Sequence, residues 1–196
     1  MPWKGGAAMK KKKPGVVRII GGQWRGTRLP VPDLPGLRPS GDRSRETLFN
    51  WLQMHIHGAR CVDLFAGSGV LGLEAASRGA AEVILVEKSR KATQDLRASL
   101  KRLNAERVEV IEADAITWLA HCDPQTMDIV FIDPPFGTDL EVRSLELLTA
   151  GDCVSRGGFA YVETAREAPA IVPIPGWEIV KEKALGEVRI QLLKKV

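Results

Sequence analysis

The amino-acid sequence predicts an α/β fold, built on a mostly parallel seven-stranded sheet with helices on both faces. From Arg60 onward, short apolar runs alternate with longer segments of helical periodicity, which is the pattern of a doubly wound parallel sheet. The last two strand-like segments instead flank Gly186 closely, as the strands of an antiparallel hairpin do. A chain of 196 residues fits one such domain with a short appendage.

The predicted elements of this sheet follow one another in a regular order. We expect five buried strands at residues 61–64, 82–86, 108–111, 127–132 and 158–163. Between them we expect a short helix ending near residue 118 and longer helices at residues 70–78, 89–103 and 140–148. The antiparallel hairpin at one edge of the sheet would comprise residues 177–183 and 187–193.

The segment before the sheet has a different composition. Residues 1–15 are rich in Gly and Lys, which predicts a disordered basic tail. Residues 16–41 predict a short RNA-facing hairpin around Gly21-Gly22, followed by a proline-rich linker. The main domain at residues 42–196 would then open with a helix from residue 42 to about residue 53, with Asp42 or Ser40 as its N-cap.

Basic residues are concentrated in this N-terminal segment. Residues 1–45 contain 11 Lys and Arg and two acidic residues, a net charge of +9, whereas residues 46–196 carry −5. Such a segment suits a polyanion such as RNA, because each Lys or Arg at a phosphate releases counterions. For Lys10–Lys13 a solubilising tail explains the charge equally well. The candidate RNA contacts are the arginines beyond this tail and one aromatic residue among them: Arg18, Trp24, Arg25, Arg28, Arg38, Arg43 and Arg45.

Other features of the composition narrow the class of protein. The three cysteines, Cys61, Cys122 and Cys153, are too few and too scattered for a disulfide framework, so we expect reduced thiols in a cytoplasmic protein. The histidines show no metal-ligand spacing with these cysteines, and we therefore expect no metal. No apolar run approaches about 18 residues, which argues against a membrane span.

Acidic residues follow four of the predicted parallel strands. They are Asp63, Glu87, Asp114 and Asp133. The carboxyl ends of parallel strands meet at one edge of a sheet, and ligands of doubly wound folds bind at that edge. We therefore expect a ligand site that contains these four side chains.

A glycine-rich loop lies between the first two of these acids. Residues 67–72 match G-x-G-x-x-G, and Glu87 follows the first glycine by 20 residues, as in a dinucleotide site. Asp63 favours S-adenosylmethionine instead, because the ammonium and sulfonium groups of that cofactor attract a carboxylate, whereas a pyrophosphate does not. Glu87 would accept both ribose hydroxyls, and Asp114 with the Ala115 amide would bind adenine. A dehydrogenase is the alternative.

The fourth strand ends in Asp133-Pro134-Pro135-Phe136, a pattern that suits methylation of an exocyclic amine on a nucleic-acid base. The lone pair of such an amine is delocalised into the ring, and Asp133 with the Pro134 carbonyl can accept its two N–H bonds. Pro135 keeps Pro134 extended, and Phe136 offers a face on which an extruded base can stack. The alternative is a simple strand-ending turn. The tetrapeptide does not itself choose between guanine N2 and adenine N6.

Three further segments and this tetrapeptide together point to one family. From Arg18 to its end, the chain resembles the bacterial 16S ribosomal RNA guanine-N2 methyltransferases that modify guanine 966, most specifically in Arg18–Gly26, Leu37–Leu52 and Asp63–Glu74. The resemblance implies a Rossmann-like class I methyltransferase that uses S-adenosylmethionine on small-subunit RNA already carrying ribosomal proteins. The candidate cofactor contacts are then Asp63, Phe65, Ala66, Gly67, Ser68, Gly69, Glu87, Lys88, Asp114, Ala115 and Asp133.

Two rival functions stay open. An adenine-N6 methyltransferase acting on DNA or RNA would usually carry a target-recognition insertion, and the predicted elements leave no room for one. A non-catalytic RNA-binding assembly factor would not need an intact glycine-rich loop together with D-P-P-F. An RNA-modifying enzyme of this size can act alone, so we expect a monomer. Residues 1–14 lie outside the family pattern.

Overall fold

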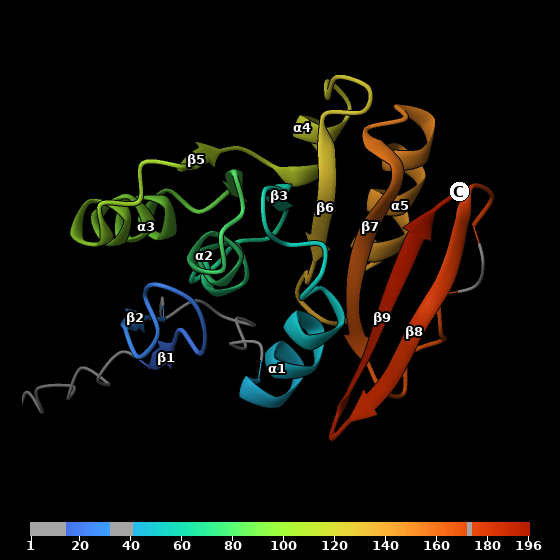
Figure 1. The fold of residues 1–196 in the computed structure, drawn as a ribbon. Helices are drawn as coiled ribbons and strands as arrows, with labels where there is room; N and C mark the ends of the chain where they lie inside the picture. Colours follow the sequence, from blue (N-terminus) through green and yellow to red (C-terminus); the bar gives the residue numbers. More distant parts are fainter. Residues whose placement is uncertain (1–14, 32–40, 172–173) are drawn as a thin grey trace, which may run out of the picture.

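The structure, a computed structural model, describes residues 15–31, 41–171 and 174–196. Its main strands are β3 (Arg60–Asp63), β4 (Glu82–Glu87), β5 (Val108–Glu112), β6 (Met127–Ile132), β7 (Val154–Ala165), β8 (Trp177–Leu185) and β9 (Val188–Lys195). They form a seven-stranded sheet in the order β5-β4-β3-β6-β7-β9-β8 (Figure 1). Strands β3 to β7 run parallel, whereas β9 is antiparallel to both β7 and β8. The predicted mostly parallel sheet with its C-terminal hairpin is confirmed.

Helices cover both faces of the sheet, as predicted (Figure 1). They are α1 (Asp42–Trp51), α2 (Val70–Ser77), α3 (Arg90–Leu103), α4 (Ala115–Leu119) and α5 (Leu140–Ala150). Helices α1 to α3 pack into one core cluster, and α4 and α5 pack into a second. Side chains of strand β6 point alternately to the two faces of the sheet: Ile129 and Phe131 belong to the first cluster, and Val130 and Ile132 belong to the second. Among the described residues, no helix is long and apolar enough to cross a membrane.

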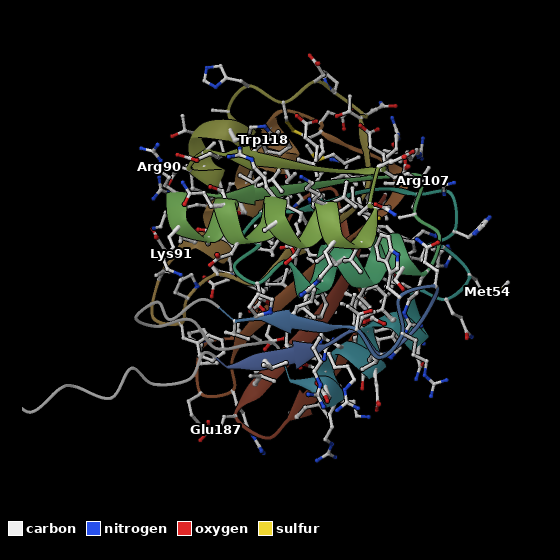
Figure 2. The ribbon with its side chains drawn as sticks, turned by 90° about the vertical axis from the view of Figure 1, so that its left-hand side faces the viewer. Met54, Arg90, Lys91, Arg107, Trp118 and Glu187 are labelled. Carbon is white, nitrogen blue, oxygen red and sulfur yellow. A yellow bond between two sulfur atoms is a disulfide. The ribbon has the colours of Figure 1, made fainter. Side chains whose placement is uncertain are left out.

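The predicted N-terminal hairpin is also confirmed. Strands β1 (Val16–Arg18) and β2 (Arg28–Pro30) pair antiparallel, with Val17 opposite Leu29. These two side chains are buried in the first core cluster, so the hairpin shares the core of the sheet. We call residues 15–31 the N-terminal arm. The arm lies alongside α3, where Arg102 donates a hydrogen bond of 2.9 Å to the Arg28 carbonyl (Figure 2).

Gly21 and Gly22 lie in the connection between β1 and β2, as expected, and pack against the end of α2. Gly22 has a positive φ of 75°, and a Cβ atom there would meet the Ser77 carbonyl oxygen at 1.9 Å. The Ser77 hydroxyl donates to the Gly21 carbonyl at 2.6 Å and accepts from the Trp24 amide at 2.9 Å. The glycines therefore allow the arm to dock on α2 without a steric clash.

A buried carboxylate completes this docking. Glu74 of α2 accepts from the Ile20 amide at 2.8 Å and from Arg78 Nε at 2.9 Å. Arg45 of α1 lies 3.5 Å from the same carboxylate and donates to the Arg18 carbonyl at 2.8 Å. All eight residues of α2 are buried. One fully buried helix thus joins the arm to the sheet.

Parts of the predicted N-terminal organisation differ or lie outside the described residues. Residues 1–14 of the predicted tail at 1–15, and residues 32–40 of the predicted linker, lie outside the described residues. Helix α1 has Gly41 as its N-cap, without a side-chain hydrogen bond to the cap. The expected Asp42 cap is therefore wrong, because Asp42 is already in the first turn and pairs with Arg45. Ser40 is not among the described residues.

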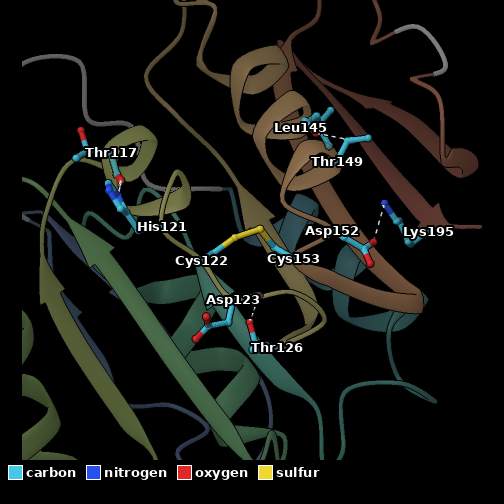
Figure 3. The surroundings of a disulfide bond; sticks show 10 residues. All are labelled: Thr117, His121, Cys122, Asp123, Thr126, Leu145, Thr149, Asp152, Cys153 and Lys195. Carbon is cyan, nitrogen blue, oxygen red and sulfur yellow. Dashed lines mark hydrogen bonds and ion pairs between the residues drawn. A yellow bond between two sulfur atoms is a disulfide. The ribbon is translucent and has the colours of Figure 1, made fainter.

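Cys122 and Cys153 form a disulfide that joins the segment after α4 to the start of β7 (Figure 3). Their Cα atoms are 6.2 Å apart although 31 residues separate them in sequence. The expectation of three reduced thiols is wrong for this pair, whereas Cys61 is a free buried thiol. Sequence spacing hides the pairing, because packing of α4 against α5 on one face of the sheet brings the two segments together.

Candidate active site

A cavity of about 640 Å³ lies at the carboxyl ends of the parallel strands, the edge at which the sequence predicts a ligand site. This volume is in the usual range for small-molecule and cofactor pockets. Its walls come from the strand ends, the first turn of α1 and the turn between β8 and β9. Of the predicted cofactor and amine-site residues, the following line it: Phe65, Gly67, Glu87, Lys88, Asp114, Ala115, Asp133, Pro134, Pro135 and Phe136.

The glycine-rich turn between β3 and α2 forms one end of this cavity. Gly67 and Gly69 have positive φ values of 52° and 74°, which favour glycine. A Cβ atom at Gly69 would lie 2.5 Å from Leu96 Cδ2, so this glycine also lets α3 approach closely. Gly67 lines the cavity, whereas the predicted contacts Ala66, Ser68 and Gly69 do not. These three residues shape the turn without forming the cavity wall.

Asp63 supports the turn from beneath. Its carboxylate accepts from the Gly72 amide at 3.1 Å, and it does not line the cavity. Burial raises the pKa of Asp63 to about 7, opposed by the hydrogen bond from Gly72. The sequence places Asp63 at the correct strand end, but the structure turns its carboxylate toward the start of α2.

Glu87 is held rigidly at the end of β4. One carboxylate oxygen accepts from the Gly67 amide at 2.8 Å, and the other accepts from the Ser89 amide at 2.7 Å. Each oxygen retains a further lone pair, so both can still accept from a bound hydroxyl. Glu87 thus offers a fixed pair of acceptors beside the glycine-rich turn.

Asp114 follows β5 and is the N-cap of α4. Its carboxylate accepts from the Thr117 amide at 3.1 Å, and the residue is exposed at the cavity wall. Ala115 is buried beside it and also lines the cavity. A side chain at a helix N-cap is fixed in direction, which leaves its second oxygen in a defined position for a ligand.

The Asp133–Phe136 segment follows β6 and lies at the other end of the cavity. Pro134 is buried, and Phe136 is half-buried at the cavity wall. Thr138 Oγ1 donates to the Pro135 carbonyl at 3.0 Å, which closes the turn after the tetrapeptide. The four predicted strand-end acids therefore reach the same edge of the sheet, with Asp63 beneath the cavity and the other three in its wall.

Glu163 is a cavity residue that the sequence analysis did not identify. It lies near the carboxyl end of β7, lines the cavity and is only 3% exposed. Tyr161 Oη donates to its carboxylate at 2.6 Å, and burial raises the pKa of Glu163, opposed by hydrogen bonds from Tyr161 and Ser44. Its position at the end of the fifth predicted strand was the available signal, equivalent to that of the four acids already named.

The predicted RNA contacts lie in three kinds of environment. Exposed side chains are those of Arg18, Arg25, Arg28 and Arg43, and Trp24 is half-buried. Arg45 has no exposed surface and pairs with Asp42 and Glu74, so we assign it to the junction between arm and domain. Arg38 is outside the described residues.

Comparison with known proteins decides the family. A family described as Conserved hypothetical protein 95 matches residues 17–194. Over 189 residues the chain is 44% identical to ribosomal RNA small subunit methyltransferase D of Escherichia coli strain K12, which covers 94% of this chain and 95% of that protein. The chain belongs to this methyltransferase family. Family membership excludes the dehydrogenase alternative.

Solved structures show the same fold. The putative methyltransferase yhhF from Escherichia coli superimposes with a TM-score of 0.85 at 41% identity, covering 92% of this chain and 98% of that one. An RNA methyltransferase from Salinibacter ruber, solved in complex with S-adenosyl-L-homocysteine, has a TM-score of 0.61 at 15% identity and covers 81% and 94% of the two chains. The predicted Rossmann-like methyltransferase fold is thus confirmed for the family.

Proposed function

We propose that this enzyme transfers a methyl group from S-adenosylmethionine to the N2 amine of guanine 966 in the 16S ribosomal RNA of the assembling small subunit. The observation that carries the proposal is that one cavity joins a glycine-rich turn and two acceptor side chains to the D-P-P-F segment. Membership of a family whose relatives methylate small-subunit ribosomal RNA supports the choice of substrate.

The cofactor would occupy the end of the cavity between Gly67 and Ala115. S-adenosylmethionine, when bound, supplies a methyl group made electrophilic by its positive sulfonium. Glu87 would accept the ribose hydroxyls, because its two oxygens are already oriented by backbone amides. Asp114 and the Ala115 amide would bind the adenine, while Asp63 positions the turn through Gly72. The size of the cavity and its acidic wall fit this cationic ligand.

Asp133 and the Pro134 carbonyl would bind the target amine. Accepting both N–H bonds directs the nitrogen lone pair toward the methyl group, and Asp133 stabilises positive charge that develops on nitrogen. The surplus proton of the methylated amine would then leave to water. The proline pair limits movement of this acceptor carbonyl. Phe136, half-buried at the cavity wall, would stack on the extruded base.

The N-terminal arm would bind RNA around the target. Its exposed arginines, Arg18, Arg25 and Arg28, lie on a hairpin that is fixed to the domain through α2. Arg43 continues this charge to the cavity wall. We also propose that the chain comprises three parts: a basic tail at residues 1–15, an RNA-facing segment at 16–41 and a methyltransferase domain at 42–196. The enzyme would act as a monomer in the cytoplasm, on particles that already carry ribosomal proteins.

The direct test is methyl transfer from labelled S-adenosylmethionine to small subunits from cells that lack the cognate enzyme. The RNA is then digested and the labelled nucleoside identified. We expect N2-methylguanosine at position 966 and little incorporation into naked RNA. Labelled N6-methyladenosine would support the rival adenine methyltransferase, and binding to subunits without incorporation would support a non-catalytic assembly factor.

A further inference from the structure

Glu163 and Asp133 occupy matching positions on two neighbouring parallel strands. In the register of β6 and β7, Ile132 at the end of β6 pairs with Val162, so Asp133, directly after β6, follows at the position beside Glu163 of β7. Adjacent strands lie about 4.8 Å apart. Both residues line the cavity, so a base whose amine is held by Asp133 presents its neighbouring ring edge to Glu163.

The Glu163 carboxylate is built into this position from several sides. It is 3% exposed, and Tyr161, itself fully buried, donates to it at 2.6 Å. Ser44, at the start of α1, is a hydrogen-bond neighbour of both Tyr161 and Glu163. A carboxylate has about four lone-pair sites, so the hydrogen bond from Tyr161 leaves capacity for a further N–H bond. Burial raises the pKa of Glu163, and the hydrogen bonds of Tyr161 and Ser44 to its carboxylate oppose this shift only in part.

The bases that carry an exocyclic amine differ in the atom beside it. In guanine the amine at C2 is flanked by the N1–H donor, whereas in adenine and cytosine the ring nitrogen beside the amine is an acceptor. Asp133 and the Pro134 carbonyl bind only the amine and cannot distinguish these bases. A second carboxylate next to Asp133 can make the distinction, because it attracts a donor and repels a lone pair.

We propose that Glu163 selects guanine by accepting the N1–H bond of the target base. This inference rests on the proposed function and adds to it the group that chooses the base. A correct base gains a hydrogen bond to a charged acceptor inside a largely buried site. An adenine in the same place would oppose its N1 lone pair to the carboxylate. From the strength of hydrogen bonds to charged groups, we expect about 10- to 100-fold discrimination.

The test changes the hydrogen-bonding edge of the substrate base and one side-chain group of the enzyme. Small subunits are reconstituted with RNA that carries either guanosine or 2-aminoadenosine at the target position. 2-Aminoadenosine keeps the 2-amino group but has an N1 acceptor in place of the N1–H donor and a 6-amino group in place of the 6-oxo group. Transfer is therefore scored only as the N2-methylated nucleoside. Methyl transfer to both particles is measured for the wild type, for Glu163→Gln, whose amide can donate to an N1 acceptor, and for Glu82→Gln. Glu82 is an exposed acid at the opposite end of the parallel strands.

We expect the wild type and Glu82→Gln to methylate the guanosine particle at least tenfold faster than the 2-aminoadenosine particle. In Glu163→Gln this ratio should fall at least tenfold, while S-adenosylmethionine binding stays within about threefold. Equal rates of the wild type on the two particles would overturn the role of Glu163, whatever the variant does. An unchanged ratio in an active Glu163→Gln would do the same. If the wild type fails on guanosine particles, the proposed function itself is wrong.

Discussion

The guanidinium of Arg45 lies 3.5 Å from the carboxylate of Glu74, and neither side chain has any exposed surface. This ion pair joins α1 to α2. Arg45 also donates a hydrogen bond to the Arg18 carbonyl of the N-terminal arm, and Glu74 accepts one from the Ile20 amide of the same arm. The pair therefore acts as an internal junction between three segments.

Replacement of Glu74 should test this junction. Glu74→Ala would remove the buried partner of Arg45 and Arg78 and leave Arg45 paired with the exposed Asp42. We expect it to lower the free energy of unfolding by about 3–5 kcal/mol. Urea denaturation followed by circular dichroism measures the loss. Asp95→Ala, which removes one partner of the exposed Lys91–Asp95 pair, is the control and should cost less than about 1 kcal/mol. Similar losses of stability in the two variants would show that the buried pair stabilises the fold no more than an exposed pair does.

Substitution of two glycines in the N-terminal arm can distinguish the cost of a left-handed backbone from the cost of a steric clash with α2. Gly22 and Gly26 both have positive φ, but a Cβ atom at Gly22 would meet Ser77 O at 1.9 Å, whereas one at Gly26 meets nothing within 4 Å. Gly26→Ala should cost about 1–2 kcal/mol from the left-handed backbone alone. Gly22→Ala should cost more and expose the arm to limited proteolysis. Equal stability and equal cleavage rates would rule out the docking role of Gly22.

Asp133→Ala should abolish methyl transfer while leaving S-adenosylmethionine binding within a few-fold. The reason is that Asp133 is proposed to bind the amine, whereas Glu87 and Asp114 are proposed to bind the cofactor. Rates come from label incorporation into small subunits, and cofactor affinity comes from isothermal titration. Asp139→Ala, an exposed acid just beyond the same loop, is the control and should keep near-full activity. Near-full activity of Asp133→Ala would contradict the mechanism.

Charge removal from the arm should weaken RNA binding in a salt-dependent manner. In the double variant Arg25→Gln and Arg28→Gln, each lost phosphate contact should reduce the slope of log K against log salt by roughly 0.9 for duplex-like RNA. Binding to small subunits is measured at several salt concentrations. Arg156→Gln, exposed near the start of β7, changes charge away from the arm and should keep the wild-type slope. An unchanged slope in the double variant would remove these arginines from the interface.

Acid should weaken the link between β3 and β6. Asp128 accepts from Arg60 Nη2 at 2.8 Å, and this hydrogen bond is the largest cause of the lowering of the Asp128 pKa to about 2. Because the folded pKa is depressed, the stabilisation is present above the unfolded pKa of about 3.9 and is lost as pH falls toward about 2. Asp128→Asn should therefore be less stable than the wild type at pH 6, and the difference should shrink by pH 2.5. Urea denaturation at pH 6 and at pH 2.5 measures the difference in the free energy of unfolding. Asp123→Asn, a substitution of an exposed acid, is the control. A difference between Asp128→Asn and the wild type that stays the same at both pH values would contradict this explanation.

Local sequence patterns predicted the sheet, its helices and the strand-end acids. These features can be recognised from residues that are close together in the sequence. What they could not predict depends on contacts between distant segments. Arg45 has the local context of a basic RNA-binding segment, yet Glu74 draws it into the core. Cys122 and Cys153 meet only through packing of α4 with α5. The strand-end position of Glu163 could have been read from the sequence, but its place beside Asp133 follows from the pairing of β6 with β7, which sequence order does not reveal.

Helix α2 has no solvent-facing position, because all eight of its residues are buried between the sheet and the arm. Its first turn adjoins the glycine-rich turn, and its last turn holds the arm through Ser77. Most surface helices can accumulate neutral substitutions on one side, but this one has no such side. In a library of random variants, we therefore expect residues 70–77 to tolerate fewer replacements than α3. Evolution of the RNA specificity of this enzyme would have to proceed around α2 and leave the helix itself nearly fixed.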